Sequence, residues 1–117
     1  MFTLSIPQPI LEVAAREVLA ELPAHIRFSM NGRLERGIML AAEGAVMQYK
    51  DRNQPWRENL FQVRSSNPYQ PPFSYLVDLD ELTCECPDFE NGYHCKHLLA
   101  AQINERSKQL MLPPRYF

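Results

Sequence analysis

Three cysteines and one histidine near the end of the chain stand at spacings that suit a metal ion. Cys84 and Cys86 form a Cys-x-Cys pair, and Cys95 and His97 form a Cys-x-His pair after an eight-residue gap. Residues i and i+2 of an extended segment project to the same side, so each pair can hold one ion. Thiolates and a neutral imidazole satisfy tetrahedral zinc, and four protein ligands leave no open coordination position. The spacing therefore predicts one structural Zn2+ rather than a catalytic metal.

Other uses of these cysteines explain the pattern less well. A disulfide framework, or three small buried hydrophobic residues, does not account for an odd number of cysteines clustered beside a histidine. A nucleophilic Cys/His pair would use one thiol and leave two unexplained. Nothing in the sequence resembles a secretory signal. We therefore expect a reducing, intracellular setting, in the cytoplasm or, in a eukaryote, the nucleus.

The residues around the two pairs resemble a known zinc-binding family. Cys86-Pro87-Asp88-Phe89 and the run Cys95–Ala100 are similar to the SWIM zinc finger. The chain is identified on these motifs as a small, stand-alone SWIM protein, and the likeness spans roughly residues 31–105. Looser matches upstream resemble the helix and strands that precede such fingers: Arg36-Gly37, Gly44-Ala45-Val46, Phe61-Gln62-Val63 and Tyr75-Leu76-Val77.

His94 is the rival of His97 for the fourth ligand position. The family pattern selects His97. The i, i+2 relation of Cys95 and His97 also repeats that of the first pair, whereas neighbouring residues such as His94 and Cys95 point apart. We expect His94 to be a loop or surface histidine.

The first 30 residues contain an apolar stripe at helical spacing. Pro9 is placed to open this helix and Pro23 to end it. The stripe predicts either a helix packed on its own domain, which is the interpretation we favour, or a docking helix for a partner. Its members recur at i, i+3, i+4, i+7, i+8 and i+11: Leu11, Ala14, Ala15, Val18, Leu19 and Leu22.

The remaining patterns predict a mixed fold around the finger. A second helix is expected from Asn31, as N-cap, to Glu43, with Gly44 as terminator, although Gly37 inside it is unfavourable. Short alternating runs then predict a three-stranded antiparallel meander. The last helix would begin at Cys95 and end near Lys108, with Leu99 and Ile103 facing the sheet. The three strands are expected at residues 45–50, 60–64 and 73–79.

These elements predict an α+β fold with N-terminal helices, the meander, a zinc knuckle and a C-terminal helix. At 117 residues and 45% hydrophobic content, one core beyond the metal site is expected. We divide the chain into an N-terminal helical extension (1–30), a SWIM domain (31–108) and a C-terminal tail (109–117). No apolar run approaches the roughly 20 residues of a membrane span, so no membrane association is expected.

Basic residues gather in the middle of the chain with aromatic residues between them. The formal net charge is −2, which argues mildly against strong nonspecific nucleic-acid binding. A phosphate-binding and base-stacking surface and an ordinary solvated surface are equally compatible with the cluster. Lys96, between two ligands, can touch a phosphate or compensate thiolate charge. The candidate nucleic-acid contacts are Arg33, Arg36, Lys50, Arg52, Trp56, Arg57, Arg64 and Lys96.

The resemblance to SWIM fingers also implies a function. SWIM fingers are implied to bind DNA or proteins and occur in transposases, chromatin-remodelling ATPases and recombination accessory proteins. No Walker loop, nuclease carboxylate set or kinase motif is present, so we expect neither catalysis nor a small-molecule substrate. The chain is expected to bind DNA or act as a DNA-associated adaptor. The alternative is a protein-interaction subunit of a larger recombination, replication or mobile-element complex, without direct DNA contact.

Overall fold

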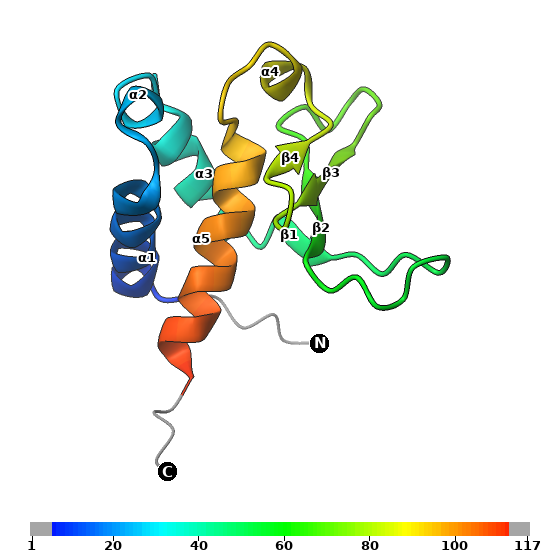
Figure 1. The fold of residues 1–117 in the computed structure, drawn as a ribbon, viewed down its shortest axis with the longest axis horizontal. Helices are drawn as coiled ribbons and strands as arrows, with labels where there is room; N and C mark the ends of the chain where they lie inside the picture. Colours follow the sequence, from blue (N-terminus) through cyan, green and yellow to red (C-terminus); the bar gives the residue numbers. More distant parts are fainter. Residues whose placement is uncertain (1–5, 113–117) are drawn as a thin grey trace.

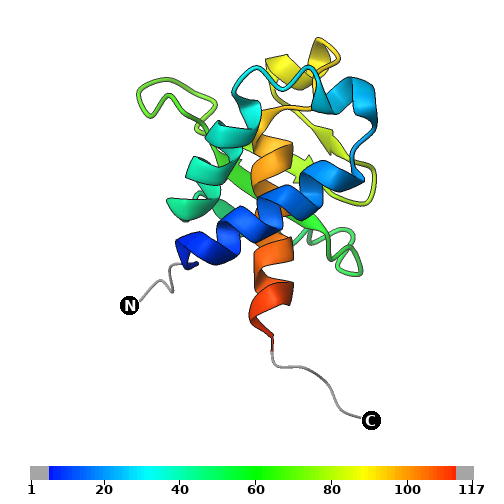
Figure 2. The ribbon, with the colours of Figure 1, turned by 90° about the vertical axis from the view of Figure 1, so that its left-hand side faces the viewer.

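The computed structural model describes residues 6–112 and confirms the α+β class. Figure 1 shows three layers, with α1 and α3 on one side, α5 in the middle and the sheet on the other side. Seen from the side in Figure 2, α1 crosses α5 while α3 lies beside it. The elements are α1 (Gln8–Glu21), α2 (Ala24–Arg27), α3 (Arg33–Ala42), β1 (Val46–Gln48), β2 (Leu60–Arg64), β3 (Ser74–Asp78), β4 (Thr83–Cys84), α4 (Pro87–Glu90) and α5 (Lys96–Met111).

The N-terminal helix has the predicted limits and packs on its own chain. Pro9 lies in the first turn of α1, where its missing N–H costs nothing, and the helix ends at Glu21, with Leu22 as its C-cap just before Pro23. Most of the apolar stripe is buried against α3 and α5. The same cluster contains Leu99 and Ile103 of α5. Packing of this helix, the interpretation favoured from the sequence, is therefore confirmed.

The second helix begins one residue later than a cap at Asn31 would require. Asn31 and Gly32 both adopt positive φ angles, of 48° and 77°, and no side chain caps the first turn. The predicted Asn31 cap is wrong, because Asn31 is used to turn the chain. The predicted end is confirmed, since Gly44 follows α3 at a φ of 71° and donates its N–H to the carbonyl of Ala41.

Gly37 stands where two helices approach closely. A Cβ atom there would lie 3.0 Å from Cβ of Leu99 and 3.3 Å from the carbonyl oxygen of Lys96. Gly37 was unfavourable for a helix in the sequence analysis. In the structure it lets α3 lie directly against the first turns of α5, where Cys95 and His97 lie.

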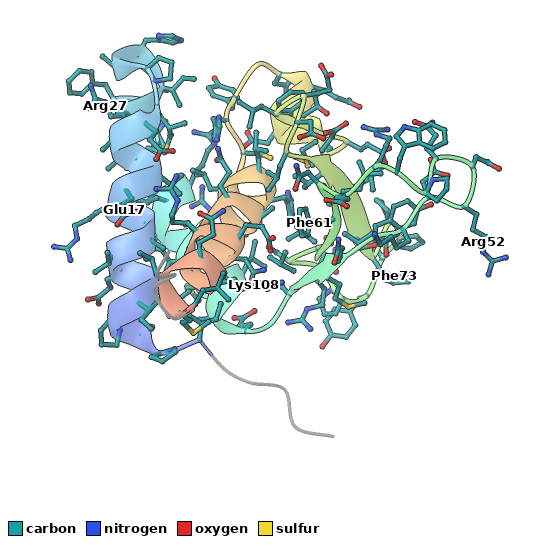
Figure 3. All side chains as sticks on the ribbon, turned by 60° about the horizontal axis from the view of Figure 1, so that its bottom comes forward. Glu17, Arg27, Arg52, Phe61, Phe73 and Lys108 are labelled. Atoms are coloured by element: carbon teal, nitrogen blue, oxygen red, sulfur yellow. The ribbon has the colours of Figure 1, made fainter. Side chains whose placement is uncertain are left out.

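The predicted meander is present, and a short fourth strand extends it. The strand order is β1-β2-β3-β4, with all neighbours antiparallel. Phe61 pairs with Val77 and Val63 with Tyr75, and these side chains face α5 in the first core cluster. Figure 3 shows Phe61 between α5 and the sheet. Strand β4 was not predicted, because two residues are too few to show alternation.

The last helix packs on both sides, and its orientation differs from the expected one. Leu98 and Ala101 of α5 face the sheet in the cluster with Phe61. Leu99 and Ile103, which we predicted to face the sheet, pack instead against α1 and α3. Helical periodicity identifies two apolar faces on α5 but does not say which neighbour covers each.

Candidate metal centre

The four predicted ligands come from three elements that meet at one end of α5. Cys84 ends β4, and Cys86 is the N-cap residue of α4. Cys95 is the N-cap residue of α5, and His97 lies in the first turn of that helix. We call these residues the Cys3His group. The one-turn helix α4 was not predicted, because a four-residue helix leaves no periodic pattern.

The Cys3His group has the compactness that tetrahedral zinc requires. One ligand atom from each residue lies within 4.8 Å of all the others. Two sulfur atoms on one zinc ion, each about 2.3 Å from it, are separated by roughly 3.8 Å in tetrahedral geometry. All four residues are buried, and Cys95 has no exposed surface. The donor set and its spacing therefore fit a closed structural zinc site.

The imidazole of His97 is the clearest sign that an ion belongs here. Both ring nitrogens are buried and have no hydrogen-bond partner among residues 6–112. A buried polar group without a partner is costly, so a native structure normally satisfies it. The ring of Tyr75 lies 4.8 Å from the His97 ring, centroid to centroid, and closes one side of the site. A metal bond to one nitrogen would satisfy that atom.

The three thiols alone would share their protons unevenly. The hydrogen bond to Cys86, followed by that to Cys95 and by burial, raises the pKa of Cys84. The same two cysteines, Cys84 first, lower the pKa of Cys86. The pKa of Cys95 is about 11, because the lowering effect of Cys84 is outweighed by the Cys86 thiolate and by burial. Three thiolates in this space need a cation.

Backbone donors help two of these sulfur atoms to carry negative charge. The N–H of Phe89 points to Sγ of Cys86, and the N–H of Leu98 points to Sγ of Cys95, each at 3.4 Å. Both sulfur atoms thus cap a helix N-terminus, and the longer helix α5 places its positive dipole end at Cys95. These contacts favour the thiolate form, which is the form that binds zinc.

His94 lies outside the Cys3His group. Its Nε2 atom is 2.7 Å from Oε1 of Gln102 on α5, and its side chain is half-buried. Burial lowers the pKa of His94. The side chain points to the outer turns of α5 rather than to the cysteines, so the structure offers His97, and not His94, to the ion.

Arg33 holds the finger loop and is not open to solvent as a nucleic-acid contact would be. Its Nε and Nη2 atoms donate to the two carboxylate oxygens of Asp88 at 2.7 and 3.0 Å. Its guanidinium also lies 4.2 Å from the ring centroid of Tyr93 and donates to two carbonyls of the loop before α3. Only 9% of the residue is exposed. This role was not predicted, because Arg33 and Asp88 are 55 positions apart in the sequence.

The remaining basic candidates divide between the two ends of β2. Lys50, Arg52 and Trp56 lie on the β1–β2 loop, which enters β2 at Leu60, and Figure 3 shows Arg52 far out on this projection. Arg57, on the same loop, is held in an ion pair by Asp78. Five residues of strand, about 16 Å, separate this end of β2 from the other. The basic cluster seen in the sequence is therefore not one continuous patch.

At the other end of β2, Arg36, Arg64 and Lys96 surround the start of the β2–β3 loop. A groove of about 330 Å³ is lined by Arg36, Arg64, Ser65 and Ser66, with Glu43 also on its wall. Lys96 reaches the same loop, with its Nζ 2.6 Å from Oγ of Ser66. We call this surface the basic groove. The two serines were not predicted as site residues, because their sequence context is typical of a turn.

Comparison with known proteins places the finger in a family. Residues 75–103 match the model of the SWIM zinc finger. No curated protein and no solved structure gives a significant match to the chain. The matched segment begins in β3 and ends within α5, which is shorter than the span 31–105 expected from the sequence.

The matched segment contains all four members of the Cys3His group, in the order Cys-x-Cys, eight residues, Cys-x-His. Within residues 6–112, no helix is both long enough and apolar enough to cross a membrane. The family match, the spacing of the ligands and their buried convergence lead to one conclusion. Residues 75–103 form a zinc finger of the SWIM type that binds a structural zinc ion.

Proposed function

We propose that this chain is a non-enzymatic, zinc-stabilised module that contacts the phosphate backbone of nucleic acid through the basic groove. It would serve as a DNA-binding protein or as a DNA-associated adaptor. The observation that carries the proposal is the convergence of Arg36, Arg64 and Lys96 with two serine hydroxyls beside the finger. Arginine, lysine and hydroxyl groups are the usual donors to phosphate oxygens.

In this proposal the zinc ion has a structural role and takes part in no reaction. Cys95 and His97 flank Lys96, so the folded finger fixes where Lys96 points. A zinc ion with four protein ligands has no position left for a water or substrate, which argues against hydrolysis at this site. Any catalysis would then belong to a partner of the module.

The charge of the molecule sets the expected strength of binding. The net charge is −2, and three thiolates with one zinc ion add about one further negative charge. Glu43 lines the basic groove, and Asp88 lies close to Lys96 on the surface that adjoins the finger. We therefore expect moderate affinity with a strong dependence on salt, rather than tight nonspecific coating of DNA.

The proposal is tested by fluorescence anisotropy with zinc-loaded protein and labelled single- and double-stranded DNA. Replacing Arg36 or Arg64 by alanine should weaken binding and reduce the slope of log K against log salt by about one unit for each phosphate that is no longer neutralised. Arg52→Ala is the matched control, because it removes an exposed arginine from the far end of β2. Weaker binding with Arg52→Ala alone would move the interface to the β1–β2 loop.

The alternative is a protein-interaction subunit that makes no direct contact with DNA. Several large aromatic side chains favour it, because Phe28 and Tyr69 are each 89% exposed and Trp56 is 72% exposed. Aromatic residues are enriched at protein interfaces. The apolar stripe of α1 is buried and does not supply the docking face. Absence of DNA binding at any salt concentration, with zinc fully bound, would leave this alternative standing.

A further inference from the structure

Strand β1 forms one edge of the sheet and ends the hydrogen-bonded ladder. Within residues 6–112 it pairs with β2 alone, as the order β1-β2-β3-β4 shows. It contains only three residues, Val46–Gln48. Met47, in its centre, is 63% exposed, on the side of the sheet opposite α5. The three residues of β1 include no charged side chain and no proline, two features that often protect natural sheet edges, although the strand is short.

The direction of the backbone groups on this edge follows from the ladder. The N–H of Tyr49 donates to Leu60 at 2.9 Å, and the N–H of Arg64 donates to Ala45 at 3.0 Å. In an antiparallel pair, residues alternate between those that bond to the neighbouring strand and those whose N–H and C=O point away. Ala45, Met47 and Tyr49 bond to β2, so Val46 and Gln48 present their backbone groups outward.

An apolar groove runs beside this edge. It has a volume of about 730 Å³, lies between β1, the last turn of α3 and the last turns of α5, and reaches past the edge of the sheet to Met47. Arg64 and Lys108 also line it, each with a side chain 55% exposed, and Glu43 is the one carboxylate that the described residues place on its wall. Its apolar lining consists of Ile6, Ala41, Ala42, Val46, Met47 and Met111. We call it the edge groove.

We propose that the edge groove binds an extended segment of a partner protein, which adds to β1 as a fifth strand of the sheet. Only a strand presents donors and acceptors at the spacing of about 6.8 Å that separates Val46 from Gln48 along β1. Alternate side chains of that strand would enter the apolar lining. Exposed ion pairs are weak, so Arg64 and Lys108, now paired with Glu43 at 3.6 Å and with Glu105 at 3.2 Å, can turn to acidic residues at the ends of the segment.

A partner strand suits this edge better than a second copy of the chain. Two β1 strands could match both outward-facing residues by pairing Val46 of each copy with Gln48 of the other. That register would place the polar side chain of the second copy's Gln48 on the groove side of the sheet, opposite Val46, where the lining is apolar. The inference goes beyond the proposed function, because it concerns a protein ligand at a separate groove that shares only Glu43 and Arg64 with the basic groove.

The first test is amide hydrogen exchange of the zinc-loaded full chain, followed residue by residue by NMR without nucleic acid. The amides of Val46 and Gln48 should exchange rapidly, whereas that of Tyr49, bonded to Leu60, should be protected. Protection of Val46 and Gln48 in the free monomer would mean that the chain covers its own edge. Protection that rises with protein concentration would indicate a second copy. Either result would overturn the proposal.

The second test selects a ligand from a displayed library of random heptapeptides. Peptides that bind the wild type should alternate apolar residues at i, i+2 and i+4, and should protect Val46 and Gln48 from exchange. Met47→Asp should weaken their binding at least tenfold. Met39→Asp, a change at a methionine that is 58% exposed on α3, is the matched control and should leave it unchanged. Failure to enrich such peptides, or equal weakening with both variants, would refute the assignment.

Discussion

The finger and the helical layer are stabilised in different ways, although both depend on α5. In the helical layer, α1, α3 and the later turns of α5 bury an apolar cluster that includes Leu11 and Ile103. In the finger, a two-residue strand and a four-residue helix surround three cysteines and a histidine. The first region can be ordered by the hydrophobic effect, whereas the second has too little regular structure to be ordered without its ion.

Contacts made by α3 connect these regions. Gly37 lets α3 touch the first turns of α5, where Cys95 and His97 lie. Arg33, at the start of α3, binds Asp88 of α4 in a bidentate ion pair. The hydrogen bond from Arg33 is the main cause of the lowered pKa of Asp88. We therefore expect damage to the finger to spread to the helices only weakly, and chiefly through α3.

The largest effect is expected from Cys86→Ser, which removes one ligand. Structural zinc can contribute on the order of 10 kcal/mol to folding, so release of the ion should unfold the finger. Far-UV circular dichroism should show that α1 and part of α5 remain helical. Zinc content is measured by elemental analysis of the purified protein.

His94→Gln is the matched control for Cys86→Ser, because His94 adjoins a ligand but bonds to Gln102. This variant should keep one zinc ion per chain. Stoichiometric zinc in Cys86→Ser, or its absence in His94→Gln, would contradict the ligand assignment. Complete loss of helix in Cys86→Ser would instead show that the two regions are not separable.

An intermediate effect is expected from Arg33→Met, which breaks the link between α3 and the finger loop. Hydrogen bonds to a charged group contribute about 2 kcal/mol, and Asp88 would remain partly solvated, with 38% of its side chain exposed. Zinc affinity, measured by competition with a chromogenic chelator, should fall by about tenfold to thirtyfold. Arg36→Met, an exposed position on the same helix, should leave it unchanged. Equal zinc affinities for the wild type and Arg33→Met would contradict the proposed link between α3 and the finger loop.

The smallest effect is expected from Arg106→Met, within the helical layer. Arg106 bonds to Glu17 and Glu21 of α1 at 2.9 and 2.5 Å, but these carboxylate side chains are 40% and 60% exposed. Such pairs contribute about 0.5 kcal/mol and are screened by salt. The melting temperature of the zinc-loaded protein should fall by a few degrees at low salt and less at high salt. A weaker affinity for zinc in this variant would show that the helical layer and the finger are more strongly coupled than expected.

Local spacing explains why parts of the fold and site were predictable. The Cys-x-Cys pair follows the i, i+2 geometry of an extended segment, whereas Cys95 and His97 lie at the start of α5, and the structure brings both pairs together. The apolar stripe of α1 and the prolines that mark the two ends of the helix also lie within one short segment. In contrast, β4 and α4 are too short to carry a period, and neither was predicted.

The surroundings of the candidate nucleic-acid residues could not be predicted from neighbouring positions in the sequence. Arg33 and Arg57 looked available in the sequence, but each is paired with an aspartate far along the chain, Asp88 and Asp78. Arg36, Arg64 and Lys96 come from three different elements and converge only because α3, β2 and α5 pack together. Their binding of nucleic acid remains a prediction.

The metal, its four ligands and helix α1 could be predicted from the sequence, because each depends on residues a few positions apart. Tertiary packing settled which side of α5 meets the sheet and which arginines pair with distant carboxylates. Those outcomes depend on contacts between residues tens of positions apart. Such contacts depend on how whole helix and sheet faces pack, and a short sequence pattern does not predict that packing.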